Sequence, residues 1–309
     1  MRGRPVLYEE ALMVKVAWYY YFESMTQQTI AQQVGISRMR VVKLLEKARQ
    51  TGIIQFKLRQ TGASRLEVER QVIARFALSD AFIVPTPPPG AVVNESIANA
   101  AALYISDRLG ENAFINIGYG DTPNRILNNL ATMAEQPLSC VSLTGGVNYY
   151  LPDARSNVFN AKLFLMPAPL LANSPETAEA MRNEASVLDI SRMCSLAGIS
   201  VVGIGAMHES ATIVQNGILS KNDLTYLGMH GAVGDILSHF IDKDGRLVKT
   251  PLEDRLLAIP LDALKALPCV IGAAAGEAKV AAIHAALQGG YLDVLITDEA
   301  TAAKLLTHQ

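Results

Sequence analysis

Apolar residues near the start of the chain recur with the spacing of α-helices. Over Glu9–Phe22 they lie three or four positions apart and so share one helix face: Leu12, Val16, Tyr19 and Tyr20. Thr26 is suited to cap a second helix that ends at Gly35, and Ser37 to cap a third that ends at Gly52. The order of helix, glycine turn and helix predicts a helix-turn-helix, and the alternating residues of IIQFKL after Gly52 predict a small wing strand.

A different pattern follows Gly90. Short apolar stretches with glycine turns precede amphipathic segments, in the order FINIGYG, CVSLTGG, SVVGIGA, VIGAAAG and VLITDEA. This alternation predicts an α/β domain in which helices cover a parallel sheet. The amphipathic segment Ser64–Phe76 precedes a further strand, AFIV. That segment either links and dimerises the chain or packs on its own domain.

The composition fits two globular domains. The 309 residues are 50% apolar and 18% charged, whereas one domain commonly has about 100–200 residues. Only 6% are aromatic, which favours covered aliphatic strands over an aromatic-rich sandwich. We expect one domain at residues 1–60 and a second, larger domain at residues 61–309.

The net charge of −2 conceals an uneven distribution of charge. Residues 1–60 contain ten Lys and Arg against four Glu, or +6, so residues 61–309 carry −8. Such asymmetry predicts that the basic part binds an anionic partner while the larger part has another task. Double-stranded DNA is the expected partner of the basic part.

Several other classes of protein find no support in the sequence. Lys15 interrupts the apolar run Ala11–Phe22, so we expect neither a signal peptide nor a membrane span. Cys140, Cys194 and Cys269 lie far apart, which predicts buried thiols in a reducing cytoplasm. The five histidines lack metal-ligand spacing, and no dinucleotide or Walker fingerprint is present, so no cofactor is expected.

The third predicted helix carries the candidate DNA-reading side chains. In a helix-turn-helix its first residues meet base edges in the major groove, where Arg38 and Arg40 could each bind guanine bidentately. Lys43 and Lys47 are better placed for phosphates. The alternative is a basic helix that is merely solvated. The predicted DNA-contacting set is Gln27, Gln28, Ser37, Arg38, Met39, Arg40, Lys43 and Lys47.

Four glycine-containing loops are candidate effector contacts. Gly118–Thr122 and Thr144–Gly146 offer backbone donors for phosphate, Gly231–Asp235 a carboxylate for sugar hydroxyls, and Gly276–Lys279 a lysine in the first turn of a helix. Because ligands bind beyond the carboxyl ends of parallel strands, these loops together predict a pocket for a small phosphorylated polyol. The alternatives are that the glycine turns are architectural and that Lys279 is a surface lysine.

Several stretches together resemble the SorC family of bacterial transcriptional regulators. They are the helix-turn-helix stretch up to IIQFKL, then GYGDT, SLTGGV, PAPL, VVGIGA, GAVGDIL and AAGEAK, and they cover nearly the whole chain in order. The resemblance implies an operator-binding domain at residues 1–60. It implies an effector-binding and oligomerisation domain at residues 61–309, similar to sugar-phosphate isomerases and deaminases, and tetramers that a phosphorylated sugar loosens from DNA.

The resemblance also implies which residues meet the effector. Asp235 and Lys279 fall on positions expected to hold its polar body and its phosphate. The two glycine loops supply Gly120, Asp121, Thr122, Gly145 and Gly146. Some relatives have arginine where this chain has Thr144, so a monophosphate or an unphosphorylated polyol fits better than a bisphosphate.

Two functions follow from the sequence. The first is a transcriptional regulator, a repressor of a carbohydrate or polyol operon, that is not an enzyme and acts as a dimer or tetramer. The second is a sugar-phosphate isomerase or deaminase with a DNA-binding head, with Asp121, Asp235 or Glu277 as its base. No acid–base pair at a recognisable spacing supports this second hypothesis.

Overall fold

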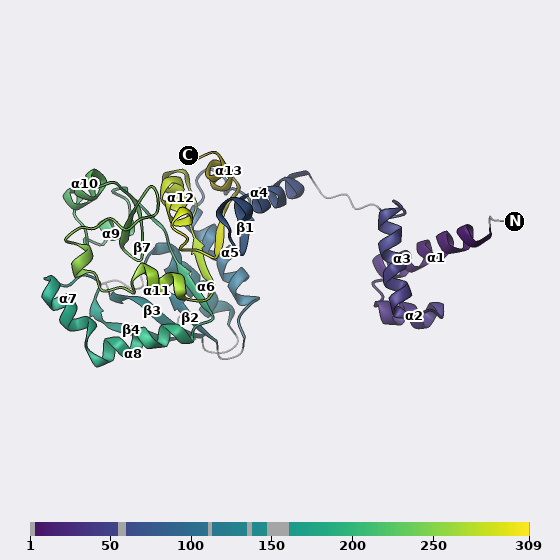
Figure 1. The fold of residues 1–309 in the computed structure, drawn as a ribbon, viewed down its shortest axis with the longest axis horizontal. Coiled ribbons are helices and arrows are strands. Elements are labelled where there is room, and N and C mark those ends of the chain that lie inside the picture. The colour runs from purple at the N-terminus through teal and green to yellow at the C-terminus, as the bar shows by residue number, and fades with distance from the viewer. Residues whose placement is uncertain (1–3, 55–59, 111–112, 135–137, 147–160, 309) are drawn as a thin grey trace. The chain divides into compact units, whose positions relative to one another are not determined.

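The chain forms two compact units, each described by itself. The computed structural model describes residues 4–54, 60–110, 113–134, 138–146 and 161–308. Internal contacts define an N-terminal unit, Met1–Ala63, and a C-terminal unit, Ser64–Gln309 (Figure 1).

The N-terminal unit contains α1 (Arg4–Tyr21), α2 (Gln27–Val34) and α3 (Arg38–Gln50). Thr26 and Ser37 are the N-caps of α2 and α3: each side-chain oxygen accepts the N–H three residues later at 3.2 Å. Gly35 ends α2 with φ of +71°, a conformation that favours glycine. The predicted helix-turn-helix is confirmed, although α1 begins before Glu9. Of the predicted wing, only Ile53 and Ile54 are described, and they lie in a bend.

Three helices bury one small core in this unit. Its fully buried members come from every helix: Val16, Ile30, Val41 and Ala48. Ile53 and Ile54 pack against the same core. The outward face of α3 is thereby left to its charged residues.

Among the described residues of the C-terminal unit, a seven-stranded parallel sheet has the order β1-β10-β9-β5-β2-β3-β4. Its strands are β1 (Asp80–Val84), β2 (Phe114–Ile117), β3 (Leu138–Gly146), β4 (Ala161–Pro169), β5 (Ile199–Val202), β9 (Val270–Ala273) and β10 (Val294–Asp298). A small antiparallel sheet contains β6 (Gly205–Ala206), β7 (Ala232–Ile236) and β8 (His239–Asp242). The predicted α/β fold with a parallel sheet is confirmed.

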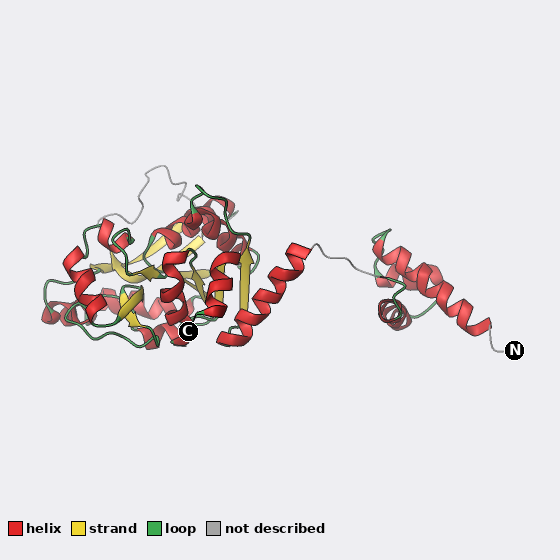
Figure 2. Ribbon diagram, turned by 90° about the horizontal axis from the view of Figure 1, so that it is seen from above, coloured by secondary structure: helices red, strands yellow, loops and turns green. Residues whose placement is uncertain are grey.

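Helices lie around the large sheet of this unit (Figure 2). The α-helices are α4 (Gln60–Phe76), α5 (Val93–Ser106), α6 (Asp121–Met133), α7 (Pro175–Arg182), α8 (Ala185–Met193), α9 (Thr212–Gln215), α10 (Lys221–Met229), α11 (Leu261–Ala266), α12 (Val280–Gln288) and α13 (Glu299–Thr307). The described residues also contain the 3-10 turns η2 (Cys194–Leu196), η3 (Glu253–Arg255) and η4 (Glu277–Lys279).

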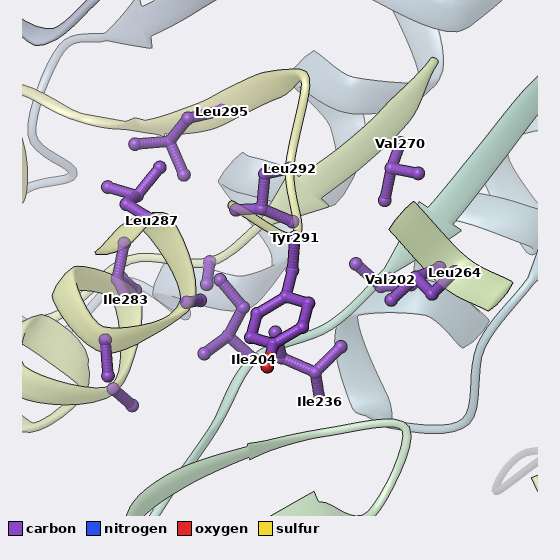
Figure 3. Close-up of a cluster of buried hydrophobic side chains, with 14 of the residues drawn as sticks. Val202, Ile204, Ile236, Leu264, Val270, Ile283, Leu287, Tyr291, Leu292 and Leu295 are labelled. Atoms are coloured by element: carbon purple, nitrogen blue, oxygen red, sulfur yellow. The ribbon is translucent and has the colours of Figure 1, made fainter. Parts of the chain in front are cut away.

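Two apolar clusters lie on opposite faces of the sheet. Val294 and Ile296 of β10 pack with α5 and α6, whereas Leu295 packs with α4, α11, α12 and α13. Figure 3 shows Ile283 and Leu287 of α12 with Leu295 in the second cluster. Both faces are therefore covered, and the carboxyl-terminal edge of the sheet is the place left for a ligand.

Two predicted loops are strands instead. Ala232–Asp235 lies in β7, where Gly234 lets the strand approach α12: a Cβ there would be 2.3 Å from the Ala282 Cβ. β3 likewise continues through Thr144–Gly146, because Gly145 passes so close to β4 that a Cβ would lie 2.2 Å from the Pro169 oxygen. In both cases the glycine permits close packing rather than a turn.

α4 packs on its own unit, which was one of the two alternatives for this segment. Val72 is fully buried in the second cluster, and Phe76 packs edge-on against His284 of α12 at 5.5 Å. Glu69 covers the open edge of the sheet, since its Oε1 accepts the Ile83 N–H at 2.9 Å.

Candidate functional site

A cavity opens where the chain reverses its direction of travel across the sheet. From β2 the chain moves through β3 to β4, and it then returns to β5 on the other side of β2. Loops after β2 and β5 therefore diverge and leave a crevice at their carboxyl ends. A cavity of about 200 Å³ lies there; its polar and glycine lining includes Asn94, Tyr119, Gly120, Asp121, Thr122, Gly203, Gly205, His208, Ser210, Asp235, Ser238 and Lys279.

Five of the eight predicted effector residues line this cavity: Gly120, Asp121, Thr122, Asp235 and Lys279. Gly120 caps α6 with φ of +138°, which requires glycine. Thr122 is buried, and its Oγ1 has no hydrogen-bond partner within the described parts of the chain. An unpartnered hydroxyl at a helix start is a group that a bound ligand would satisfy.

Asp121 is already occupied by neighbouring side chains. Its carboxylate accepts the Asn94 Nδ2 at 2.8 Å and the Arg125 Nε at 2.9 and 3.0 Å. The hydrogen bonds between Arg125 and Asp121 raise the pKa of Arg125 above its usual value, and Arg125 also pairs with Glu95. Since Asp121 lies in the first turn of α6, it also meets the positive end of that helix. Asp121 thus fixes the cavity wall rather than offering a free acceptor.

Asp235 and Lys279 are two oppositely charged residues of the cavity lining. Burial raises the pKa of Asp235 to about 6, although the Ser238 N–H at 3.1 Å and the positive Lys279 oppose the rise. Burial also lowers the pKa of Lys279, and the carboxylates of Asp235 and Asp121 oppose that fall. The cavity therefore offers one cation and one readily protonated carboxylate.

The segment that brings Lys279 to the cavity differs from the prediction. Lys279 ends the 3-10 turn η4 and is the N-cap of α12, rather than lying in the first turn of that helix. Gly276 starts the turn with φ of +110°.

Gly205 makes room for Asp235. A Cβ at Gly205 would lie 1.9 Å from the Asp235 Oδ1, so any other residue there would displace the carboxylate. The prediction omitted Gly205 together with Asn94, His208, Ser210 and Ser238. The sequence shows Gly205 only as part of the glycine-containing segment GIGA. Knowledge that β5 lies next to β2 would have placed this segment beside the glycine loop after β2. The other four residues lie in segments without a distinctive pattern.

His208 and Ser210 form a hydrogen-bonded pair on the cavity wall. The Nδ1 of His208 accepts the Ser210 N–H at 3.2 Å and lies 2.8 Å from the Ser210 Oγ. In the neutral ring this arrangement leaves the proton on Nε2. The pair can therefore supply a donor to a ligand.

Thr144, Gly145 and Gly146 lie outside the cavity lining. Their backbone groups are used within the fold: the Gly145 N–H donates to the Leu257 oxygen at 2.6 Å, and Thr144 forms an antiparallel bridge with Ala258. Thr144 and Gly145 are also buried. The Gly145 N–H is therefore not free to bind phosphate.

In the N-terminal unit the predicted DNA-contacting residues surround the start of α3. Arg38, Met39 and Arg40 occupy its first turn and are exposed, with Met39 at 66%. Arg38 shares a surface hollow of about 570 Å³ with Gln27 and Gln28. Ser37 serves as the cap, so the first turn of α3 is held rigidly.

The two lysines of α3 are in different states. Lys43 is exposed, whereas Lys47 is paired with Glu9 of α1, Nζ to Oε1 at 3.1 Å. Both partners are about half exposed, and such pairs are weak, so a phosphate could replace Glu9.

Three further observations concern membrane spans, metal sites and cysteines. In the described ranges no helix is both long and apolar enough to span a membrane. Nor does the described part of the chain contain a cluster of three or more residues suited to a metal. Cys140 and Cys194 are buried, and burial raises their pKa values to about 12 and about 11, so both are inert thiols; Cys269 is half-buried.

Comparison with known proteins matches both units. Residues 60–307 match a family described as "Putative sugar-binding domain", and residues 16–51 match region 4 of sigma-70. The second match spans the helix-turn-helix of the N-terminal unit.

Curated relatives and solved structures cover nearly the whole chain. Transcriptional regulator LsrR of Klebsiella pneumoniae is 36% identical over 97% of this chain and 94% of its own length, and LsrR of Escherichia coli K12 is 34% identical over 96% and 95%. The full-length sorbitol operon regulator SorC from Klebsiella pneumoniae has a TM-score of 0.68 at 26% identity, over 96% of this chain and 98% of its own.

These relatives are regulators, and the enzyme alternative finds no support among them. The helix-turn-helix, the parallel-sheet domain and the whole-length matches agree on one family. The chain belongs to the SorC family of sugar-binding transcriptional regulators.

Proposed function

We propose that this regulator binds operator DNA through residues 1–60 and a small phosphorylated sugar or polyol through residues 61–309. The observation that carries the proposal is the cavity at the carboxyl edge of the sheet, which combines the Lys279 ammonium with the Asp235 carboxylate. Its volume of about 200 Å³ suits one small molecule rather than a polymer.

Each polar group of the cavity fits one part of such an effector. A phosphate fits between Lys279, the unpartnered Thr122 hydroxyl and the start of α6 at Gly120. Hydroxyl groups fit Asp235, which can accept from them when it is ionised. One cation suits a monophosphate better than a bisphosphate. The similarity of this chain to SorC, a regulator of a sorbitol operon, supports a polyol effector.

Residues at the start of α3 make the DNA contacts. Arg38 and Arg40 bind base edges in the major groove, while Gln27, Gln28 and Lys43 hold the backbone. The exposed Met39 side chain supplies an apolar contact for a thymine methyl group. The chain acts as a repressor in the cytoplasm and binds DNA as a dimer or tetramer, in which the effector favours the state with lower operator affinity.

Thermal unfolding of the full chain tests the effector. The additives are matched pairs: D-ribose and D-ribose 5-phosphate, D-sorbitol and D-sorbitol 6-phosphate. We expect the phosphorylated member of one pair to raise the unfolding midpoint more, because its phosphate binds Lys279. A ligand at 100 times its Kd stabilises the folded protein by about 2.7 kcal/mol. Lys279→Gln should abolish the phosphate preference, while Lys249→Gln, at an exposed position, should keep it. An undiminished preference in Lys279→Gln would remove Lys279 from the site.

A further inference from the structure

The neighbours to which α13 is hydrogen-bonded include the segment that carries Lys279 and the helix α4. The chain enters the C-terminal unit through α4, which directly follows residues 55–59 and the helix-turn-helix. α13 thus hydrogen-bonds both to the cavity-lining segment and to the helix nearest in sequence to the DNA-binding unit, whereas α12 contacts that helix through the packing of His284 against Phe76.

On the cavity side, α13 fixes the turn that delivers Lys279. The Gly276 N–H donates to the Thr301 Oγ1 at 2.9 Å, and Thr301 is 1% exposed. Glu277, one residue further along, forms an ion pair with Lys304 on the next turn of α13. Ala278 and Lys279 then line the cavity. A displacement of Lys279 by a ligand would therefore pull on Thr301 and Lys304.

On the other side, α13 holds α4 at two points. The Arg65 Nε donates to the Glu299 Oε1 at 2.7 Å. Ten residues further along α4, or about 15 Å, Arg75 donates to the Leu306 oxygen and, at 2.7 Å, to the His308 oxygen. The contacts run in the same order along both helices, so a shift of α13 acts along most of α4.

The strength of these contacts suits a reversible shift. Arg65, Glu299 and Lys304 are all partly exposed, and exposed ion pairs contribute little to stability. Val72, between the two arginines, is fully buried, and Phe76 at the end of α4 packs on His284. The arginine side chains can thus change their contacts with α13 while the helix stays attached to the sheet.

We propose that α13 transmits occupancy of the cavity to α4 and thereby sets operator affinity. This rests on the proposed function, and it names Thr301 and Lys304 as the residues that receive the signal and Arg65 and Arg75 as those that pass it on. Effector and operator then weaken one another's binding by the same factor, as linkage requires.

Thr301→Val is the central variant, because it keeps the shape of the side chain and removes the acceptor of the Gly276 N–H. Its matched control is Thr307→Val on the same helix, since the Thr307 Oγ1 contacts only carbonyls of α13 in the described structure. Arg65→Gln, at a partly exposed position, is a second variant that leaves the core untouched should Thr301→Val fail to fold.

Hydrogen exchange of residues 64–76 in the full chain is the readout. Without ligand, we expect α4 to exchange at least fivefold faster in Thr301→Val and Arg65→Gln than in the wild type, and unchanged in Thr307→Val. The sugar phosphate is D-sorbitol 6-phosphate or D-ribose 5-phosphate, whichever binds the wild type. Its addition should change the exchange rate of α4 in the wild type. Thr301→Val should bind the same sugar phosphate with a Kd within about threefold of the wild-type value and show no change in α4 exchange.

Two results would overturn the proposal: α4 exchange equal to the wild type in both variants without ligand, or a full α4 response to the sugar phosphate in Thr301→Val. If neither sugar phosphate binds the wild type, the proposed function fails instead, and the ligand-free comparison still decides the role of α13.

Discussion

Asp121 and Asp235 are the two carboxylates of the cavity, and their surroundings give them different roles. Asp121 is held by Asn94 and Arg125, whereas Asp235 keeps its raised pKa because burial outweighs its one backbone hydrogen bond. The sequence predicts both residues at the site and cannot distinguish them, because their partners come from α5, α6 and the turn after β7. A carboxylate's role depends on neighbours that folding supplies.

Asp235 should destabilise the ligand-free protein at neutral pH. Its pKa in the folded state, about 6, lies above the unfolded value, so folding favours its protonated form. The resulting cost, at most about 3 kcal/mol, is fully present above pH 6 and disappears as the pH falls towards 4. Asp235→Asn should therefore unfold at a higher temperature than the wild type at pH 8, with the two midpoints converging near pH 4. An equal midpoint at pH 8 would show that Asp235 is not desolvated.

Gly205→Ala tests the space that Asp235 needs. The added Cβ would collide with the Asp235 Oδ1, so effector affinity should fall at least tenfold while the sheet survives. Gly146→Ala is the matched control: its Cβ would lie 3.7 Å from the Ala168 oxygen, an ordinary contact, and φ at Gly146 is not positive. Isothermal titration with the sugar phosphate that stabilises the wild type measures both. Equal losses in the two variants would contradict the specific role of Gly205.

At the scale of elements, the sequence predicted the helices whose ends are fixed by neighbouring residues. The caps Thr26 and Ser37 and the turn at Gly35 act within four residues, and the predicted helices follow them closely. The strand β7 was missed because its glycine meets Ala282, a partner 48 positions away. Glycine in such a strand looks like a turn until the close approach of α12 is known.

The cap of α3 should support DNA binding without touching a base. Ser37→Ala removes the acceptor of the Arg40 N–H, which costs about 1 kcal/mol, and loosens the turn that carries Arg38 and Arg40. We expect a lower unfolding midpoint of the N-terminal unit and a several-fold loss of affinity for a duplex selected by the wild type from random DNA. Ser37→Thr keeps the hydroxyl and should retain both. A loss of affinity with unchanged stability would instead indicate a direct contact between Ser37 and DNA.

At the scale of the whole molecule, the separation of charge predicted from the sequence matches a separation of tasks. The +6 of residues 1–60 includes five exposed basic residues on α3, namely Arg38, Arg40, Lys43, Lys47 and Arg49. The larger unit is acidic overall and directs one cation, Lys279, into its cavity. A polyanion and a small anion can thus be bound by one chain at different places.

Salt dependence measures how many of these charges reach DNA. The logarithm of the binding constant falls with the logarithm of salt concentration by about 0.9 for each neutralised phosphate. Lys43→Gln should therefore reduce the slope by about 0.9 for each N-terminal unit on the duplex. Glu9→Gln should steepen it and raise affinity, because it releases Lys47 from its ion pair. Glu46→Gln, at an exposed position of α3, is the control for the loss of one acidic charge. If Glu9→Gln and Glu46→Gln changed the salt-dependence slope equally, Lys47 would not be a phosphate contact. The gain in DNA affinity would then come from the change in net charge alone.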